Sequence, residues 1–283
     1  MAIRKDGSGK RWVEMDVVLP GTPEQVWHAM ATGPGLASWF INAQVEPRVG
    51  GSVTFDFGKG VTTSGHVTAW QPPERFAYVE VEWDEGAPPC ATEITITARD
   101  GGVCLVRMVH SLFTSSDAWD DQLEGFESGW PGFFEVLRVY LTYFAGQRAA
   151  SFMVVSPSGE DALSAWKQLT QACGLAGKDV GDSCRSEFDV EPWSGVVEHV
   201  HQDAQQRWAI ARIAAPSPGL VLLGTKNTTG TRGDVETRIG KGPASNVSVC
   251  RFYYGDDAAE VCTAAEARWR GWVTRMAEET VTS

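Results

Sequence analysis

The sequence has no run of about eighteen consecutive apolar residues, the length that marks a helix able to cross a membrane. Its first ten residues are polar and rich in glycine, and they contain no apolar core of a secretion signal. We therefore expect no membrane span and a cytoplasmic location.

Patterned cysteines are also missing. The chain has six cysteines, and no two of them form a Cys-x-x-Cys pair. A structural zinc site or a disulfide framework requires closer and more regular spacing. We expect reduced, partly buried thiols and neither a metal nor another cofactor.

Basic charge is scarce, with 24 Lys and Arg against 36 Asp and Glu and a net charge of −12. A field of this sign repels phosphate, so nucleic acid is excluded as the expected partner. Nucleophile elbows, phosphate loops, dinucleotide fingerprints and zinc-binding helix motifs do not occur. We therefore assign no catalytic residue from the sequence.

The first half of the chain predicts a strand, short helices, a meander of strands and a long helix. Residues 12–19 are strand-like, and Thr22 followed by Pro23 and Gln25 has the pattern of a helix cap with a capping box. Residues 43–113 alternate between strand and turn patterns. A helix is predicted to open at residues 129–132 and to carry a wide apolar stripe that a sheet must cover.

A series of short motifs follows the same order through residues 12–149. They are Pro23 before Val26-Trp27, Trp39-Phe40, Gly50-Gly51-Ser52 before Phe55, Gly65, Pro72 before Arg75, and Gly129-Trp130. Together they resemble the AHSA1-like branch of the START/Bet v1 (SRPBCC) superfamily, a branch named for an activator of the Hsp90 ATPase. The resemblance implies a helix-grip fold, in which a long C-terminal helix closes over a curved antiparallel sheet and leaves a cavity for an apolar ligand.

The second half repeats the pattern with low identity. Trp166 follows a helix start as Trp27 does, and Ser194-Gly195 resembles Ser64-Gly65. We expect an α+β chain of two tandem helix-grip units, an AHSA1-like domain at 11–149 and a diverged copy at 150–283. The segment 227–243 is predicted to be a long loop.

Twelve tryptophans, with many other aromatic residues, could fill a core or line a pocket. Polar strand residues that could anchor a ligand include Glu80 and His110. Since Arg107 and His110 lie on opposite faces of one strand, at most one of them should point inward. The candidate cavity residues are Trp39, Phe55, Phe57, His66, Trp70, Tyr78, Glu82, Arg107, Phe133, Phe134, Leu137 and Tyr140.

The favoured hypothesis is a protein that binds and sequesters an apolar, aromatic small molecule in a helix-grip cavity. The resemblance connects such proteins with polyketide and enediyne pathways, where START-like relatives provide self-resistance. Two alternatives stay open: a polyketide cyclase or aromatase that uses a cavity His, Arg or Glu, and a chaperone partner like the Hsp90 activator.

Overall fold

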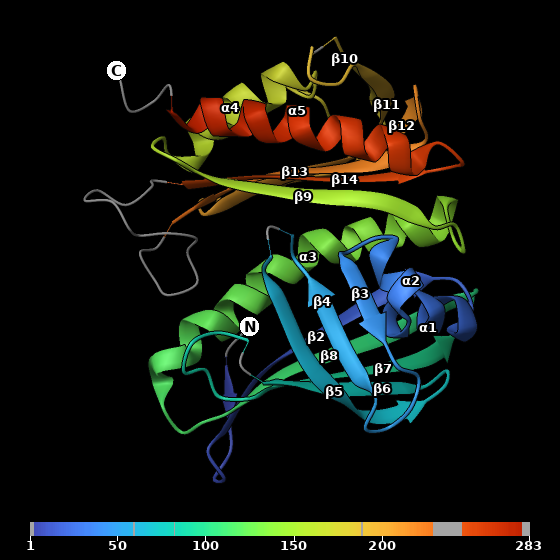
Figure 1. The fold of residues 1–283 in the computed structure, drawn as a ribbon, viewed down its shortest axis with the longest axis vertical. Coiled ribbons are helices and arrows are strands. Elements are labelled where there is room, and N and C mark those ends of the chain that lie inside the picture. Colours follow the sequence, from blue (N-terminus) through green and yellow to red (C-terminus); the bar gives the residue numbers. More distant parts are fainter. Residues whose placement is uncertain (1–2, 59, 82, 188, 229–244, 279–283) are drawn as a thin grey trace. The chain divides into compact units, whose positions relative to one another are not determined.

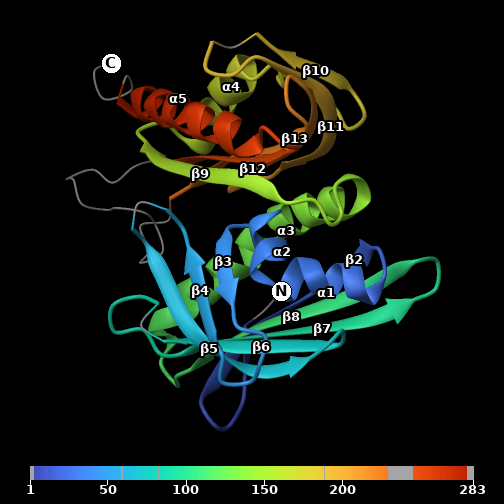
Figure 2. The ribbon, with the colours of Figure 1, turned by 45° about the vertical axis from the view of Figure 1, so that its right-hand side comes forward.

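The computed structural model describes residues 3–58, 60–81, 83–187, 189–228 and 245–278, and the chain divides into two compact units, residues 1–148 and 149–283. Each unit contains one antiparallel sheet with helices on one face, which we call its inner face (Figures 1 and 2). Within the described ranges, no helix is long and apolar enough to cross a membrane.

Unit 1 has an eight-stranded sheet in the order β1-β2-β8-β7-β6-β5-β4-β3. The polar N-terminal segment contributes β1, which pairs with β2. The predicted meander is confirmed, because β3 to β8 pair in sequence. The elements are β1 (Arg4–Lys5), β2 (Lys10–Pro20), α1 (Pro23–Ala31), α2 (Gly33–Ala37), β3 (Asn42–Val45), β4 (Ser52–Asp56), β5 (Thr62–Gln71), β6 (Arg75–Val81), β7 (Cys90–Arg99), β8 (Val103–Phe113), η1 (Asp117–Trp119) and α3 (Asp120–Tyr143).

The start of α1 forms as its sequence predicts. Thr22 is the N-cap, Pro23 is the first helical residue, and the Thr22 and Gln25 side chains form a reciprocal capping box. These bonds satisfy backbone N–H groups that have no partner within the helix.

The long helix α3 begins nine residues earlier than expected, at Asp120 rather than near Gly129. Its apolar stripe starts upstream of the predicted opening, at Leu123 and Phe126, and Pro131 lies inside the helix. Packing of this stripe against the inner face therefore overrides the breaking tendency of Gly and Pro.

Unit 2 has a six-stranded sheet in the order β10-β11-β12-β13-β14-β9. This order matches β4-β5-β6-β7-β8-β2 of unit 1, so the predicted α+β architecture of two helix-grip units is confirmed. The long loop predicted at 227–243 lies mostly outside the described residues. The elements are β9 (Ala149–Ser158), α4 (Ala162–Ala172), β10 (Ser183–Ser186), β11 (Trp193–Gln202), β12 (Gln206–Ala215), β13 (Gly219–Asn227), β14 (Ser245–Tyr254) and α5 (Ala258–Glu278).

Shared backbone features align the two sheets residue by residue. Gly65 in β5 and Gly195 in β11 each lie two residues before a valine, Val67 or Val197, at which the ladder is interrupted by a bulge. Both valines also exchange two backbone hydrogen bonds with the loop that precedes β4 or β10. Residues that correspond in this alignment are called matched positions below.

Following the strand register from these valines matches His110 of β8 with Arg251 of β14. In unit 1 the register runs through Val67, Tyr78, Thr92 and His110, and in unit 2 through Val197, Ala211, Val221 and Arg251. The same inner-face position thus carries a histidine in one unit and an arginine in the other.

The shared glycine gives a direct test of the fold. A Cβ at residue 195 would lie 2.1 Å from the carbonyl oxygen of Arg212. We expect Gly195→Ala to lower the free energy of unfolding by more than about 2 kcal/mol in urea denaturation. Gly125→Ala is the control, since a Cβ there meets no atom within 4 Å and helix propensity predicts a gain of about 0.5–1 kcal/mol. Equal stability of Gly195→Ala and the unsubstituted chain would contradict the register.

Candidate functional site

The candidate site of unit 1 is centred on His110, in the middle of the inner face. His110, Thr92 and Tyr78 are adjacent in the strand register of β8, β7 and β6, and all three are buried. The Nδ1 atom of His110 lies 2.9 Å from Oγ1 of Thr92. A row of three polar side chains therefore crosses the inner face.

The second ring nitrogen of His110 has no partner. Its Nε2 is buried without a hydrogen bond among the described residues. Burial lowers the pKa of His110 to about 4, so the imidazole is neutral near pH 7. A buried polar atom left unpaired costs about 1–3 kcal/mol, and a group that bonded it would recover that energy.

Aromatic rings from α3 cover the histidine. The Trp130 ring stacks on the imidazole with centroids 5.6 Å apart and an 18° tilt, and Phe126 lies 4.9 Å away. Both rings are half-buried. Further ring contacts extend this aromatic cover to Trp39, Phe40, Trp83, Trp119, Phe133 and Phe134.

An ion pair fixes the start of α3 over the site. The buried guanidinium of Arg11 in β2 makes two hydrogen bonds to the carboxylate of Asp120, the first residue of the helix. An acidic residue in the first turn also interacts favourably with the helix dipole. The acidic segment at the start of α3 therefore includes a structural anchor.

A half-buried carboxyl group lies near the polar row. The hydroxyl of Thr63 donates to Oε1 of Glu80 at 2.5 Å, two residues along β6 from Tyr78. Burial raises the pKa of Glu80, although the Thr63 hydrogen bond acts in the opposite direction. Burial also raises the pKa of Tyr78. In both groups burial disfavours the ionised form, and both supply hydrogen-bonding atoms on the inner face.

Most predicted cavity residues lie inside unit 1, in different surroundings. Phe133 and Phe134 belong to the aromatic cover, and Phe55 packs on Tyr78 with centroids 5.4 Å apart. Trp70 is half-buried and contacts Trp27 of α1 rather than the histidine. Leu137 and Tyr140 are buried core residues, and the Tyr140 hydroxyl forms hydrogen bonds with the loop after α3. Trp39 belongs to the aromatic cover and also donates its indole N–H to the Ala29 carbonyl.

Three predicted positions were wrong, and a fourth lies outside the described residues. His66 is on the exposed face of β5, and Phe57 follows the end of β4 with 40% of its surface exposed. Arg107 is also on the outer face, where its side chain is 49% exposed and pairs with Asp16 and Glu14. Glu82 lies outside the described residues. Strand alternation places His110 on the inner face and Arg107 on the outer face. The guanidinium of Arg107 stays at the surface because the carboxylates of Glu14 and Asp16 on β2 lie beside it.

The prediction missed Thr92, Phe126 and Trp130 as site residues. Phe126, Trp130 and Phe134 are spaced four residues apart, which is the spacing of one helix face. That signal was present, but the predicted helix start at Gly129 left Phe126 outside the helix. Thr92 carries no comparable signal, because its role depends on which strand pairs with β8.

In unit 2 the matched position is fully satisfied. Arg251 is buried, and its guanidinium donates two hydrogen bonds to Glu191 and one to the carbonyl of Leu220. The same carboxylate accepts from Tyr253 at 2.9 Å and from the Trp269 indole at 2.6 Å. Four donors therefore bind Glu191, and each guanidinium nitrogen of Arg251 has a hydrogen-bond partner.

Metal binding has no support in the part of the chain that the structure describes, where no group of three potential ligands occurs. His199 and His201 instead stack on Trp208, with centroids 4.7 and 5.1 Å apart. All six cysteines are free and buried.

Comparison with known proteins agrees with the fold of unit 1. Residues 20–142 match the family model described as activator of Hsp90 ATPase homolog 1-like protein. No curated protein matches the chain.

Several solved structures are similar at low identity. CalU16 from Micromonospora echinospora is 22% identical over 50% of this chain and 83% of its own, with a TM-score of 0.40. DynU16, a protein of the dynemicin biosynthetic locus, is 18% identical over 94% of this chain and 95% of its own, with a TM-score of 0.42. MLL2253 from Mesorhizobium loti is 24% identical over 47% of this chain and 98% of its own, with a TM-score of 0.43. Similarity at this level supports no functional conclusion.

The buried ion pair of unit 2 predicts a strong stability effect. Removing one partner leaves an uncompensated buried charge, so Glu191→Ala should cost about 3–5 kcal/mol in urea unfolding. The control is the double variant Glu191→Leu with Arg251→Met, which removes both charges and should cost much less. Equal losses in the single and double variants would contradict the pairing.

The same pair predicts a pH dependence. Burial alone would raise the pKa of Glu191, but the charge of Arg251 and the hydrogen bonds from Arg251, Trp269 and Tyr253 hold it below the usual value. The ionised carboxylate therefore stabilises the fold above about pH 4.5, and this contribution is lost as the pH falls through the lower folded-state pKa. Urea unfolding at several pH values should show the unsubstituted chain losing more stability on acidification than the double variant does.

Proposed function

Because residues 20–142 form an AHSA1-like domain of the START/Bet v1 superfamily, we propose that unit 1 binds an apolar, aromatic small molecule between α3 and the inner face of its sheet. The ligand is held there away from solvent. The proposal is one of binding and sequestration.

The observation that carries the proposal is the unpaired Nε2 of His110 beneath an aromatic cover. A ligand with one suitably placed hydrogen-bonding group would pair this nitrogen, while its ring system would contact Phe126 and Trp130. Aromatic faces favour flat ring systems through stacked and edge-to-face contacts. We therefore assign the ligand to flat, largely neutral polycyclic compounds, such as aromatic polyketides and the ring systems of enediynes.

The helix over the site has the composition of a movable cover. Gly125 and Gly129 lie in the N-terminal half of α3, and a Cβ at either position would meet no atom within 4 Å. Packing therefore does not require these glycines, although each weakens a helix by about 1 kcal/mol relative to alanine. Pro131 weakens the same segment further because it removes a backbone donor. Because Arg11 holds Asp120, partial opening of residues 121–131 would admit a ligand to His110.

Catalysis by His110 is disfavoured by its basicity. A general base works best when its pKa is near the operating pH. Since burial lowers the pKa of His110 to about 4, the ring is a weak base at neutral pH. Its neutral form is suited to hydrogen bonding.

The six free cysteines also fit the cytoplasmic location that we propose.

Ligand binding can be tested by thermal unfolding of the full chain with a panel of compounds. We expect neutral polycyclic aromatics, represented by a dihydroxyanthraquinone and an anthracyclinone, to raise the Tm by mass action. Palmitate is the flexible apolar control and should produce no comparable rise. Failure of all the aromatic compounds to shift the Tm would contradict the proposal.

Substitution of the histidine separates binding from folding. His110→Leu removes the unpaired nitrogen and puts an apolar side chain in its place, so the free protein should keep its Tm. Ligand affinity should fall at least tenfold, equivalent to about 1.4 kcal/mol. Arg107→Gln, on the outer face of the same strand, should retain full affinity. Calorimetric titration measures both, and equal affinity of His110→Leu and the unsubstituted chain would remove His110 from the site.

A further inference from the structure

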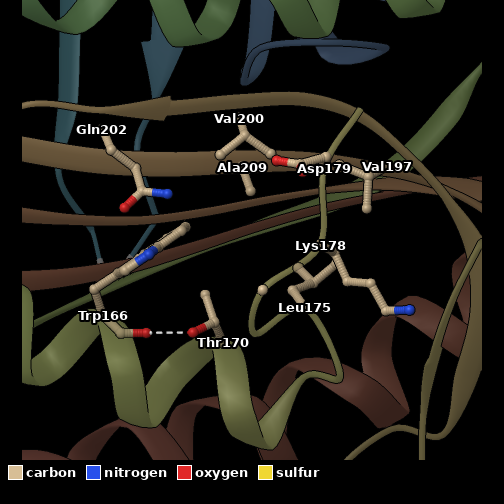
Figure 3. Close-up of a pocket in the computed structure, with 10 residues that line it drawn as sticks. Trp166, Thr170, Leu175, Lys178, Asp179, Val197, Val200, Gln202 and Ala209 are labelled. Carbon is tan, nitrogen blue, oxygen red and sulfur yellow. Dashed lines mark hydrogen bonds between the residues drawn. The ribbon is translucent and has the colours of Figure 1, made fainter. Parts of the chain in front are cut away.

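A cavity lies in unit 2, between α4 and the strands β11 and β12. It has a volume of about 130 Å³ and is bordered by Trp166 of α4, Val200 of β11 and Ala209 of β12. Figure 3 shows Trp166 rising from the helix toward the strands that carry Val200 and Ala209. All the residues around it belong to unit 2, so it is separate from the His110 site.

Unit 1 has aromatic rings at the matched positions. Trp27 and Trp166 each lie five residues after the N-cap of their helix, Thr22 or Asp161. The strand register matches the pair Trp70 and Phe76 with the pair Val200 and Ala209. The two helices therefore present the same indole to the same place on their sheets.

In unit 1 these rings fill the space. Trp27 packs edge to face on Trp70 with centroids 5.0 Å apart and lies 6.3 Å from Phe76, and the latter two rings are 5.5 Å apart. In unit 2, Val200 has an isopropyl group where Trp70 has an indole, and Ala209 has a methyl group where Phe76 has a phenyl ring. The tryptophan on the helix is present in both units. The cavity beside Trp166 therefore lies where the other unit places two rings.

We propose that this cavity binds a neutral aromatic molecule of one or two rings, which takes the place of the missing side chains against Trp166. The volume fits this class, because an apolar cavity of about 150 Å³ accommodates benzene. It is too small for drug-sized ligands, which need about 300–1,000 Å³. A polycyclic ligand of the kind assigned to unit 1 is therefore excluded.

The border of the cavity defines the polarity of the ligand. Leu175 and Val197 add apolar surface, whereas Lys178, Asp179 and Gln202 provide polar groups. One cation next to one anion leaves no net charge to favour an ionic ligand, and the Gln202 amide can bond a hydroxyl or an N–H group. Indole and phenol have this combination of a flat ring and one polar group.

Binding to the full chain can be measured by saturation-transfer NMR and calorimetric titration with four probes. Indole and phenol should bind, whereas cyclohexanol, which is not flat, and benzoate, which is charged, should bind at least tenfold more weakly. Absence of indole and phenol binding at millimolar concentration would overturn the proposal. Equal binding of cyclohexanol would overturn the aromatic assignment.

Substitutions that restore the rings locate the site. Ala209→Phe and Val200→Trp refill the cavity and should each weaken indole binding at least tenfold. Val180→Trp adds an indole at an exposed position of the same unit and should leave binding unchanged. If either filling variant fails to fold, Ala209→Leu is a smaller change with the same expected direction. Unchanged indole affinity in folded Ala209→Phe would overturn the proposal.

The outcome is independent of the proposal for unit 1. His110→Leu should leave indole binding intact, since the histidine lies in the other unit. Loss of indole binding in His110→Leu, with retention in Ala209→Phe, would move the indole site to unit 1 and overturn the inference for unit 2.

Discussion

A polar side chain at one inner-face position organises the interior of each unit, because a buried polar group must find hydrogen-bond partners. In unit 2 that side chain is Arg251, and Glu191 with the Leu220 carbonyl satisfies it from within the chain. In unit 1 the matched side chain is His110, of which only Nδ1 has a partner. The two units thus meet the same constraint differently: Arg251 has partners within the chain, whereas Nε2 of His110 is left unpaired.

The distribution of aromatic volume differs in a complementary way. Unit 1 fills the space between α1 and its sheet with Trp27, Trp70 and Phe76 and places further rings over His110. Unit 2 keeps the tryptophan on α4 but has small residues opposite it, and a cavity remains. Dense packing is the norm for protein interiors, and the small residues opposite Trp166 leave unit 2 short of it at this place. The proposed ligands follow from these differences: a polycyclic compound for unit 1 and a small ring for unit 2.

The sequence predicted features that depend on local patterns. The capping box at Thr22, the meander, the long helices and the repeated architecture follow from helix and strand periodicity and from turn residues. Strand alternation showed that at most one of Arg107 and His110 points inward. The sequence could not show which one, because the answer depends on Asp16 lying opposite Arg107 across the β2–β8 pair. Thr92 beside His110 and Glu191 beside Arg251 are contacts between distant segments. Tertiary packing also decided that α3 continues through Pro131.

The most direct test of the central claim is the protonation state of His110, measured by nitrogen NMR of the imidazole as the pH is lowered. A dry, aromatic-covered site predicts that the ring stays neutral until about pH 4, where burial places its pKa. A titration near the ordinary histidine value of about 6.5 would show that water reaches the ring. The nitrogen would then have a solvent partner, and the reason for a ligand at this position would be gone.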